Sequence, residues 1–362
     1  MSVTMREVAE RAGVSKATVS YVLNGRDVAM RIPDETRERV LCAVRELGYY
    51  PNALARSLSN KGTHTIAVVM QYSTLFSGWS GFTNELMHGV TDAAVAEGYN
   101  VMLQTRQPER HWQGGEMDPA EAEVATLTDG RVDGALLLRD VDDPLAAALR
   151  RREFPAVLMF TSSDDPDQWS IDCDNLQGGI YATEHLLSLG HRRILHLSGS
   201  PSSGPARERA LGYRTALEQA GLPVRPEWMV EAATPLVDLE PAIRLFRLPA
   251  DQRPTAIFAW SDDVAIKMMG MLRHEGVRLP QDVAIIGFDS TALCDHTDPP
   301  LTSIRQPIYA MAVQALTLLT QRMRGEILEE THIRVAPSLV IRQSCGTPSD
   351  REIGGRLQSG RG

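Results

Sequence analysis

A short segment near the start of the chain carries side chains that could recognise DNA bases. If residues 16–23 form a helix with Val19, Val22 and Leu23 turned inward, the opposite face carries Lys16, Ala17, Ser20 and Tyr21. A lysine can donate to guanine O6 and N7, and an alanine methyl can touch the methyl group of thymine. A tyrosine hydroxyl can reach a base edge or a phosphate. The candidates for phosphate and other DNA contacts are Thr4, Ser15, Thr18 and Asn24.

The rest of the chain shows no motif typical of catalysis or metal binding. It contains no P-loop, no G-x-S-x-G and no H-E-x-x-H, and its nine histidines stand singly. The cysteines Cys42, Cys173, Cys294 and Cys345 are far apart, so we expect neither a metal site nor a disulfide framework. The glycine-bearing segment 199–205 could hold an anion before a helix, but it lacks the lysine of a nucleotide site. We therefore expect no enzyme and no cofactor.

The first 49 residues contain three helical patterns. Thr4 and Glu7 fit a capping box, and Gly13 ends the pattern that they begin. Ser15 is a plausible cap for the helix of residues 16–23. A third helix should follow Ile32-Pro33-Asp34 and end at Gly48. The expected inward residues of the first and third helices are Met5, Val8, Ala9, Ala12, Thr36, Val40, Val44 and Leu47. Two short helices joined by a tight turn, with a supporting third, indicate a helix-turn-helix. A three-helix bundle without a nucleic-acid partner is the alternative.

Charge and length fit a small head on a larger body. Residues 1–61 hold ten Lys/Arg and seven Asp/Glu, which gives +3, so the remaining 301 residues carry −9 − 3 = −12. A chain of 362 residues predicts two or three folding units. No apolar run approaches the roughly 18–20 residues that span a bilayer, and the start has no apolar signal segment. We expect a cytoplasmic protein with no membrane partner.

The body, residues 62–345, alternates short apolar strands with amphipathic helices. The predicted strands are 65–70, 100–104, 132–138, 156–160, 193–198, 228–231, 255–260 and 283–288. The clearest helices between them are 82–97, 176–189, 207–220, 262–274 and 308–323. Such alternation predicts parallel sheets covered by helices on both faces. Eight strands suit two doubly wound lobes, and residues 346–362 are expected to form a disordered tail.

Ligands of open α/β sheets bind beyond the carboxyl ends of the strands. The side chains expected there are Tyr72, Trp79, Phe82, Phe160, Arg209, Trp260, Asp262 and Asp289. Arginine supplies a planar fork of donors and aspartate accepts from paired hydroxyls, which suits a sugar. The tryptophans, including Trp112 and Trp169, are candidate stacking surfaces. The alternatives are an ion pair for Arg209 and Asp289, and core positions for the tryptophans.

Several segments together resemble one known family. VAERAGVSKATVSYVLNG, IPDETRERVLCAVRELGYYPN and ALARSLSNKGTHTIAVV are similar to the lac repressor/Gal repressor family, as are DNLQGGIYATEHLLSLGHRRI and PQDVAIIGFDS in the body. The resemblance implies a helix-turn-helix DNA-binding domain joined to a periplasmic-binding-protein-like sensor. It places Lys16, Ala17 and Tyr21 at base-reading positions, and Arg209 and Asp289 at effector-binding positions.

The resemblance also implies a hinge helix within residues 50–61. Its DNA-binding residues would be Asn52, Ala55, Arg56 and Leu58, with Leu58 inserted into the minor groove at the centre of a palindromic site. A helix of about eight residues is too short to be stable alone, so it should order only beside its dimer mate on DNA. A linker leucine packed on the body is the alternative for Leu58.

Two departures bear on the site. Pro33 stands where the family often has a capping serine, and a proline is tolerated at a helix start. Ser261 stands where polyol-binding members often carry asparagine, which leaves the effector class open. The match is weakest at residues 71–80 and 105–120.

The sequence therefore predicts a regulator, most simply a repressor, that binds a double-stranded DNA operator as a homodimer or a higher oligomer. A small effector between the lobes would shift its DNA affinity. A sugar is the expected effector class, and a nucleobase or another metabolite is the alternative. A solute-binding protein without a transcriptional role would share the fold of the body, but the attached helix-turn-helix argues against it.

Overall fold

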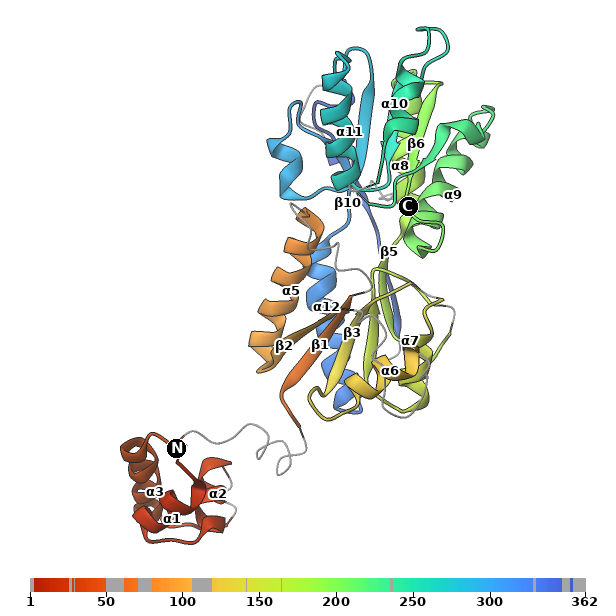
Figure 1. Cartoon of the computed structure of the whole chain (residues 1–362). Coiled ribbons are helices and arrows are strands. Elements are labelled where there is room, and N and C mark those ends of the chain that lie inside the picture. Colours follow the sequence, from red (N-terminus) through yellow and green to blue (C-terminus); the bar gives the residue numbers. More distant parts are fainter. Residues whose placement is uncertain are drawn as a thin grey trace, which may run out of the picture. The chain divides into compact units, whose positions relative to one another are not determined.

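The computed structural model describes residues 3–25, 28, 30–49, 62–70, 80–105, 119–140, 142–163, 165–234, 237–327, 330–346 and 352–353. The chain divides into two compact units, Met1–Thr63 and His64–Gly362 (Figure 1). The predictions for Asn52, Ala55, Arg56, Leu58, Tyr72, Trp79 and Trp112 lie outside the described residues.

The first unit contains the three predicted helices, α1 (Met5–Ala12), α2 (Lys16–Leu23) and α3 (Asp34–Leu47). The capping box of α1 is confirmed, because the Thr4 side chain accepts from the Glu7 backbone N–H and the Glu7 carboxylate accepts from the Thr4 N–H. Ser15 caps α2, and Gly48 ends α3 in the left-handed conformation that favours glycine. Pro33 precedes α3 and provides no side-chain cap.

The helices of this unit share a small apolar core. Its most buried members are Val8, Ala9, Ala12, Val19, Val22, Val40, Ala43 and Tyr49. Met5, Leu23, Val44 and Leu47 pack against this core as partly buried residues. The fold expected from the helical periodicity is therefore confirmed.

The second unit is built from two lobes, and the first is called the N-lobe. Its sheet has the order β11-β5-β4-β3-β1-β2, and every pair is parallel. The strands are β1 (Thr65–Met70), β2 (Asn100–Thr105), β3 (Gly134–Leu138), β4 (Ala156–Met159), β5 (Ser170–Cys173) and β11 (His332–Val335). The helices are α5 (Gly81–Glu97), α6 (Pro119–Leu127), α7 (Pro144–Arg151) and α12 (Ile308–Met323).

The second lobe, the C-lobe, repeats this arrangement. Its sheet has the order β13-β12-β10-β9-β8-β6-β7, parallel from β7 to β10 and antiparallel at β12 and β13. The strands are β6 (Ile194–Ser198), β7 (Met229–Glu231), β8 (Ala256–Ala259), β9 (Ala284–Asp289), β10 (Thr302–Arg305), β12 (Ser338–Val340) and β13 (Glu352–Ile353). The helices are α8 (Asn175–Ser188), α9 (Gly204–Gln219), α10 (Glu240–Phe246) and α11 (Asp262–His274), with short 3-10 turns at Pro226–Trp228 and Ala292–His296. The strand β13 lies inside the segment that was expected to be disordered.

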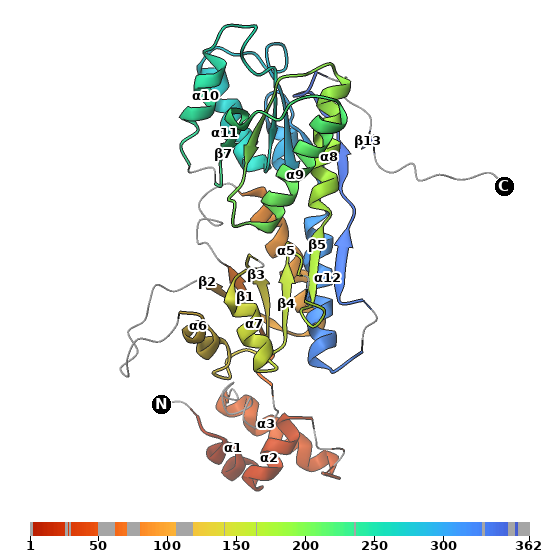
Figure 2. The ribbon, with the colours of Figure 1, turned by 90° about the vertical axis from the view of Figure 1, so that its right-hand side faces the viewer.

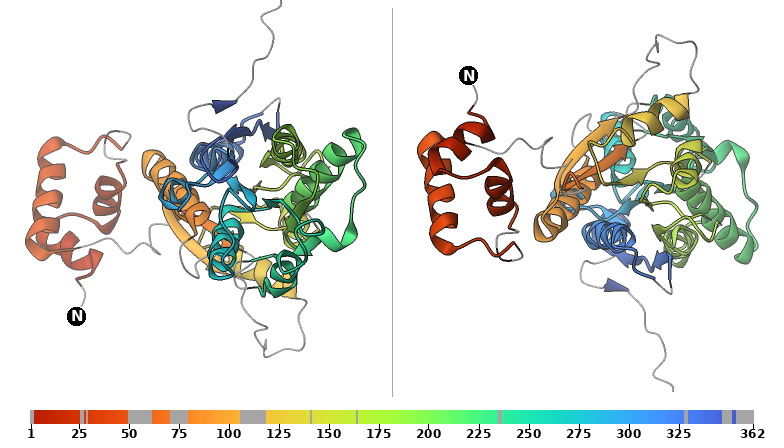
Figure 3. Two further views of the ribbon diagram at one scale, coloured as in Figure 1. Left: turned by 90° about the horizontal axis from the view of Figure 1, so that it is seen from above. Right: turned by 90° about the horizontal axis from the view of Figure 1, so that it is seen from below.

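Each sheet is covered on both faces, as the apolar strands predicted. In β6, Leu195 and Leu197 face the layer of α10 and α11, whereas Ile194 faces the layer of α8 and α9. The N-lobe alternates in the same way, with α5 and α12 on one face and α6 and α7 on the other. Figure 3 shows helices on both sides of the strands. The prediction of two doubly wound lobes is confirmed.

Three short connections join the lobes. The chain passes from β5 to α8 at Asp174, from β10 to α12 at Gln306-Pro307, and from β11 to β12 at Ala336-Pro337 (Figure 2). Because β5 and β10 each leave their sheet at the carboxyl end and enter the other lobe, the carboxyl ends of both sheets face one junction. The sequence reading missed β5, β10, β11 and β12. No helix in the described part of the chain is long and apolar enough to cross a membrane.

A histidine lies inside the C-lobe core. The ring of His196 on β6 is stacked between Tyr213 and Phe258, at centroid distances of 5.1 and 4.8 Å. Its Nδ1 lies 3.0 Å from the carbonyl oxygen of Phe258, and its Nε2 has no partner among the described residues. Burial lowers the pKa of His196 to about 4.

We predict that His196→Asn flattens the acid dependence of stability. The unfolded chain takes up a proton near pH 6.5 and the folded chain only near pH 4, so stability is lost as the pH falls between these values. The wild type should lose about 3 kcal/mol more unfolding free energy than the variant between pH 7 and pH 4. Urea denaturation at each pH measures the difference. Asp172 and Asp262, whose raised pKa values act in the opposite direction, are common to both proteins. The same change at exposed His274 is the control, and equal slopes for all three proteins would contradict the prediction.

Candidate functional site

The exposed face of α2 presents the residues that the sequence singled out. Lys16 and Ala17 are exposed, and Ser20 and Tyr21 are partly exposed, while Val19 and Val22 are buried in the core. The face therefore offers a cation, a methyl group and hydroxyls side by side. That composition suits base edges in a major groove.

The other candidates of this unit take part in local hydrogen bonds. Ser15 Oγ lies 2.9 Å from Thr18 Oγ1 and accepts from the Thr18 N–H at 3.1 Å. Asn24 Nδ2 donates to Ser20 Oγ at 3.2 Å. The hydroxyl of Thr4 is engaged with Glu7. These bonds hold the ends of α1 and α2, and Ser15 also remains exposed beside the face of α2.

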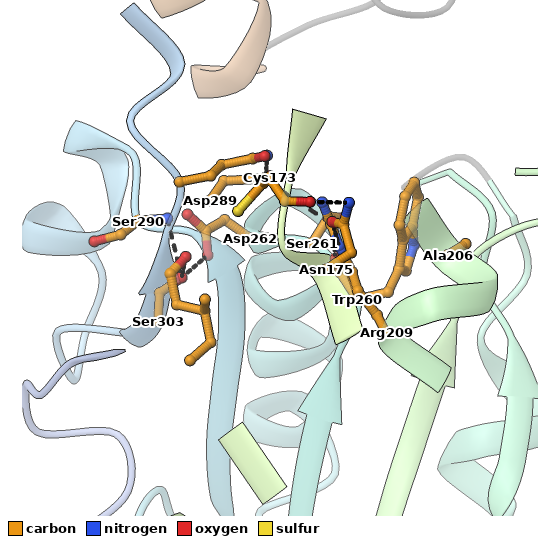
Figure 4. Close-up of polar contacts among 12 residues, drawn as sticks. Cys173, Asn175, Ala206, Arg209, Trp260, Ser261, Asp262, Asp289, Ser290 and Ser303 are labelled. Carbon is orange, nitrogen blue, oxygen red and sulfur yellow. Dashed lines mark hydrogen bonds and ion pairs between the residues drawn. The ribbon is translucent and has the colours of Figure 1, made fainter. Parts of the chain in front are cut away.

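In the second unit, Arg209 of α9 is buried and lies beside Asn175 and Trp260 (Figure 4). Its Nε donates to Asn175 Oδ1 at 2.8 Å, and its Nη1 donates to the carbonyl oxygen of Trp260 at 2.5 Å. The guanidinium lies 3.5 Å from the ring centroid of Phe288, and Nη1 lies 4.0 Å from Asp289 Oδ1. Burial lowers the pKa of Arg209, and Asp289 opposes this effect; an arginine stays charged under such conditions.

The close packing of α8 on α9 brings Arg209 to this position. A Cβ atom at Gly179 of α8 would lie 2.4 Å from the carbonyl oxygen of Arg209, a distance that no side chain tolerates. Only glycine permits this approach between the two helices. The motif NLQGG that carries Gly179 also carries Asn175, the hydrogen-bond partner of Arg209.

Asp289 ends β9 in a strained conformation. Its φ is 118°, and that of Ser290 is 53°, in the region that side chains other than glycine rarely adopt. Gln306 Nε2 donates to Asp289 Oδ1 at 2.5 Å. Burial raises the pKa of the Asp289 carboxyl, and the guanidinium of Arg209 opposes that shift. Strain at a residue held by several partners is typical of a functional position.

Partly exposed aromatic side chains stand near the carboxyl ends of strands in both lobes. In the N-lobe, the rings of Phe82 and Phe160 meet edge to face at 4.8 Å, and both residues are partly exposed. Phe160 also has a positive φ of 56°. In the C-lobe, Trp260 is partly exposed, and its Nε1 donates to the carbonyl oxygen of Ala232 at 2.7 Å. Trp169 instead precedes β5 at the opposite end of the sheet, where the guanidinium of Arg322 lies 5.2 Å from its ring, so it is no stacking surface at the junction.

Asp262 lies behind the junction, inside the C-lobe. It is 0% exposed, and its carboxylate accepts from Ser303 Oγ at 2.5 Å, from the Thr291 N–H at 2.9 Å and from Cys294 Sγ at 3.0 Å. Burial raises its pKa to about 6. These bonds use the carboxylate to hold the segment after β9. The structure thus gives Asp262 a supporting position and not an open contact position.

Two polar residues of the junction escaped the sequence reading, Asn175 and Gln306. Gln306 stands in a connection between the lobes, and Asn175 begins α8 directly after another. Each binds one member of the Arg209–Asp289 pair. Both follow strands, β5 and β10, that were not predicted. Recognising those strands would have placed both residues at carboxyl ends.

The polar centre of the C-lobe is balanced in charge. Arg209 and Asp289 balance each other in charge, and among the described residues no hydrogen bond uses the second terminal nitrogen of Arg209 or Asp289 Oδ2. One donor and one acceptor of this pair are therefore not used by the described residues. Groups of this kind suit adjacent hydroxyls or the edge of a heterocycle. The described residues contain no group of three or more His, Cys, Asp or Glu arranged to hold a metal ion.

Comparison with known families gives two matches. "Bacterial regulatory proteins, lacI family" matches residues 4–52, and "Periplasmic binding protein-like domain" matches residues 183–345. The HTH-type transcriptional repressor PurR of Photobacterium profundum is 33% identical over 343 residues, covering 94% of this chain and 98% of that protein. The protein of the same name from Vibrio parahaemolyticus is 32% identical over 345 residues, with the same coverage.

Solved structures with the same architecture include two bound to ligands. The lac repressor dimer bound to operator and the anti-inducer ONPF is 26% identical with a TM-score of 0.80, covering 95% of this chain and 99% of that chain. The complex of the transcriptional regulator CelR with cellobiose is 31% identical with a TM-score of 0.67, covering 94% and 99%.

We predict that Arg209→Met lowers the unfolding free energy by about 3–5 kcal/mol, because it leaves Asp289 buried without its cation. Urea denaturation measures the loss. Arg207→Met on the same helix is the matched control, since the Arg207 side chain is 46% exposed and should matter by about 1 kcal/mol at most. Equal effects of the two substitutions would show that Arg209 does not organise the junction.

Proposed function

Because the chain belongs to the lacI family of bacterial regulatory proteins, which regulate transcription and are not enzymes, we propose that it is a repressor whose affinity for a palindromic operator is set by a small effector between the lobes. The proposal rests on one observation: the same chain contains an exposed helix suited to DNA and a two-lobed body with a polar centre that is balanced in charge.

DNA recognition is assigned to the exposed face of α2. Lys16, Ala17, Ser20 and Tyr21 would contact base edges, and Thr4, Ser15, Thr18 and Asn24 would contact or support contacts to phosphates. The linker residues Asn52, Ala55, Arg56 and Leu58 keep the roles that the sequence suggested.

A homodimer is the proposed assembly. The backbone N–H of Asn100 donates to the carbonyl oxygen of His64 at 2.7 Å, where the linker from the first unit enters β1. On either side of Asn100 in the sequence, α5 exposes Val95 (79%) and the edge strand β2 exposes Leu103 (44%). Large exposed apolar side chains of this kind favour contact with a second copy. A dimer formed there would bring two linkers together, and a palindrome matches its two-fold symmetry.

A sugar is the proposed effector class. Arg209 and Asp289 would bind adjacent hydroxyls, and Trp260, Phe82 and Phe160 would pack against the apolar face of the ring. Tyr72 and Trp79 are proposed as further contacts. The structural relative bound to cellobiose supports this choice, and a nucleobase is the other outcome that the same screen would reveal.

Control of DNA binding would follow from a population shift. An effector that binds one arrangement of the lobes better than another changes how often each is populated. The lobes of the two subunits carry the linkers, so their arrangement sets whether the linkers can pair on DNA.

The DNA contacts are tested with duplexes selected from a randomised pool by the full chain. We expect a palindromic consensus, and Lys16→Ala or Tyr21→Ala should lower its affinity about 5- to 100-fold and relax the preference at one position of each half-site. Arg39→Ala, an exposed cation of α3, is the control and should change affinity little. Failure to enrich any sequence, or an asymmetric consensus, would overturn the proposed recognition.

The effector site is tested by a thermal-shift screen with sugars and nucleobases, followed by titration of the hit. Trp260→Phe and Asp289→Asn should each weaken binding about ten-fold or more, since each removes contacts made to the ligand. Trp169→Phe, at the far end of the N-lobe sheet, is the matched control. If the variants bind the hit like the wild type, the effector site lies elsewhere.

A further inference from the structure

The first turn of α5 touches the C-lobe through a glycine. A Cβ atom at Gly81 would lie 2.5 Å from both Cβ and Oγ1 of Thr291. Thr291 is buried, and its hydroxyl has no hydrogen-bond partner among the described residues. The close approach of the lobes at this place therefore requires glycine at position 81.

Beside the contact of Gly81 with Thr291, one carboxylate of each lobe lies near residues of the other lobe. Burial raises the pKa of Asp263 in the C-lobe, and the nearby Ser80 side chain and Gly81 backbone N–H oppose this shift. In the opposite direction, burial raises the pKa of Glu85 in the N-lobe, and the nearby backbone N–H of Ala292 opposes it. Each lobe thus places an acidic group beside backbone N–H groups at the start of a helical segment in the other lobe.

The residues of this contact are neighbours in sequence of the residues proposed to bind the effector. Gly81 immediately precedes Phe82, and Thr291 follows Asp289 by two residues through the strained Ser290. Within the C-lobe, Asp262 links Asp263 to Thr291. It directly precedes Asp263 in sequence, and its carboxylate accepts from the Thr291 N–H at 2.9 Å. A shift of Phe82 or Asp289 is therefore transmitted to this contact by one or two peptide units.

The contacts on the other side of the junction are looser. Ser202 Oγ donates to Asp140 Oδ2 at 3.3 Å, and Arg207 lies 3.8 Å from Asp142. The side chains of Arg207 and Asp142 are 46% and 81% exposed, so water screens their attraction. At Gly81 the lobes meet against a buried residue, whereas at Asp142 they meet through exposed side chains.

We propose that Ser80, Gly81 and Glu85 of the N-lobe and Asp263, Thr291 and Ala292 of the C-lobe form an interlobe clamp through which the effector site controls the arrangement of the lobes. The proposal rests on the regulatory function proposed above and specifies where that control is exerted. An effector that moves Phe82 or Asp289 on binding stabilises or breaks the clamp, and the populations of the closed and open arrangements change accordingly.

Hydrogen exchange of the full-length protein, without DNA or effector, tests the clamp. Gly81→Ala should accelerate exchange about ten-fold or more in a peptide covering residues 290–296, because this segment loses its contact with α5, and Ala292 loses the nearby Glu85 carboxylate, when the lobes separate. The substitution is in the other lobe, so the peptide itself is unchanged. Exchange in β8 should stay as in the wild type.

Gly270→Ala is the matched control. Gly270 lies in α11, and a Cβ there would meet nothing within 4 Å. The double variant Gly81→Ala/Thr291→Gly should exchange like Thr291→Gly alone, because Thr291→Gly removes the atoms that the new Cβ would strike. General damage to the fold would not be rescued in this way. If Gly81→Ala does not fold, Asp263→Asn removes the charge beside Gly81 without adding volume and should accelerate exchange of residues 80–86.

Two results would overturn the proposal. Exchange of residues 290–296 that matches the wild type in folded Gly81→Ala and Asp263→Asn would show that no clamp holds the lobes. The second result is a variant that loses protection at the clamp but binds the selected operator with the affinity of the wild type, as Gly270→Ala does. It would show that the clamp does not control DNA binding. Because exchange is measured without DNA, a failed operator selection would count against the proposed function and not against the clamp.

Discussion

The burial of one guanidinium constrains the whole junction. Arg209 can lie inside the protein only because acceptors surround it, the amide oxygen of Asn175, the backbone oxygen of Trp260 and the carboxylate of Asp289. These partners stand at the start of α8 and at the ends of β8 and β9. The positions of all three are therefore tied to a single charge. The Arg209–Asp289 pair is in consequence held in place by groups of the protein itself.

The lobes can change their arrangement without losing their cores. Each sheet is packed between two helical layers of its own, and in the described part of the chain three short connections pass from one lobe to the other. A change in the arrangement of two lobes with separate cores is governed by the contacts at their boundary. The polar centre at Arg209 and the contact at Gly81 belong to this boundary. A protein built in this way can respond to small changes in free energy at a few residues.

Much of the fold could be predicted because its signals are local. The capping box at Thr4, the cap at Ser15 and the glycine at Gly48 mark helix ends within three or four residues of sequence. Eight apolar strands were recognised for the same reason. The strands β5, β10, β11 and β12 were missed, because sequences such as SIDC and TSIR mix polar with apolar residues. Their polar side chains are buried only because distant segments supply partners, as His332 does for Ser170 and Asp262 for Ser303.

The candidate site was likewise predicted only in part from the sequence. Strand periodicity was enough to place Phe82, Phe160, Arg209, Trp260 and Asp289 beyond the carboxyl ends of strands, and residue chemistry was enough to suggest a polar ligand. Neither strand periodicity nor residue chemistry could reveal that Asn175 and Gln306 bind Arg209 and Asp289, or that Asp262 is buried inside the C-lobe. Arg209 meets partners 34 and 51 positions away in the chain, brought together by helix packing and by the connections between lobes. Helix caps and strand periods depend on neighbours in sequence, whereas the satisfaction of a buried charge depends on neighbours in space, which only the folded chain provides.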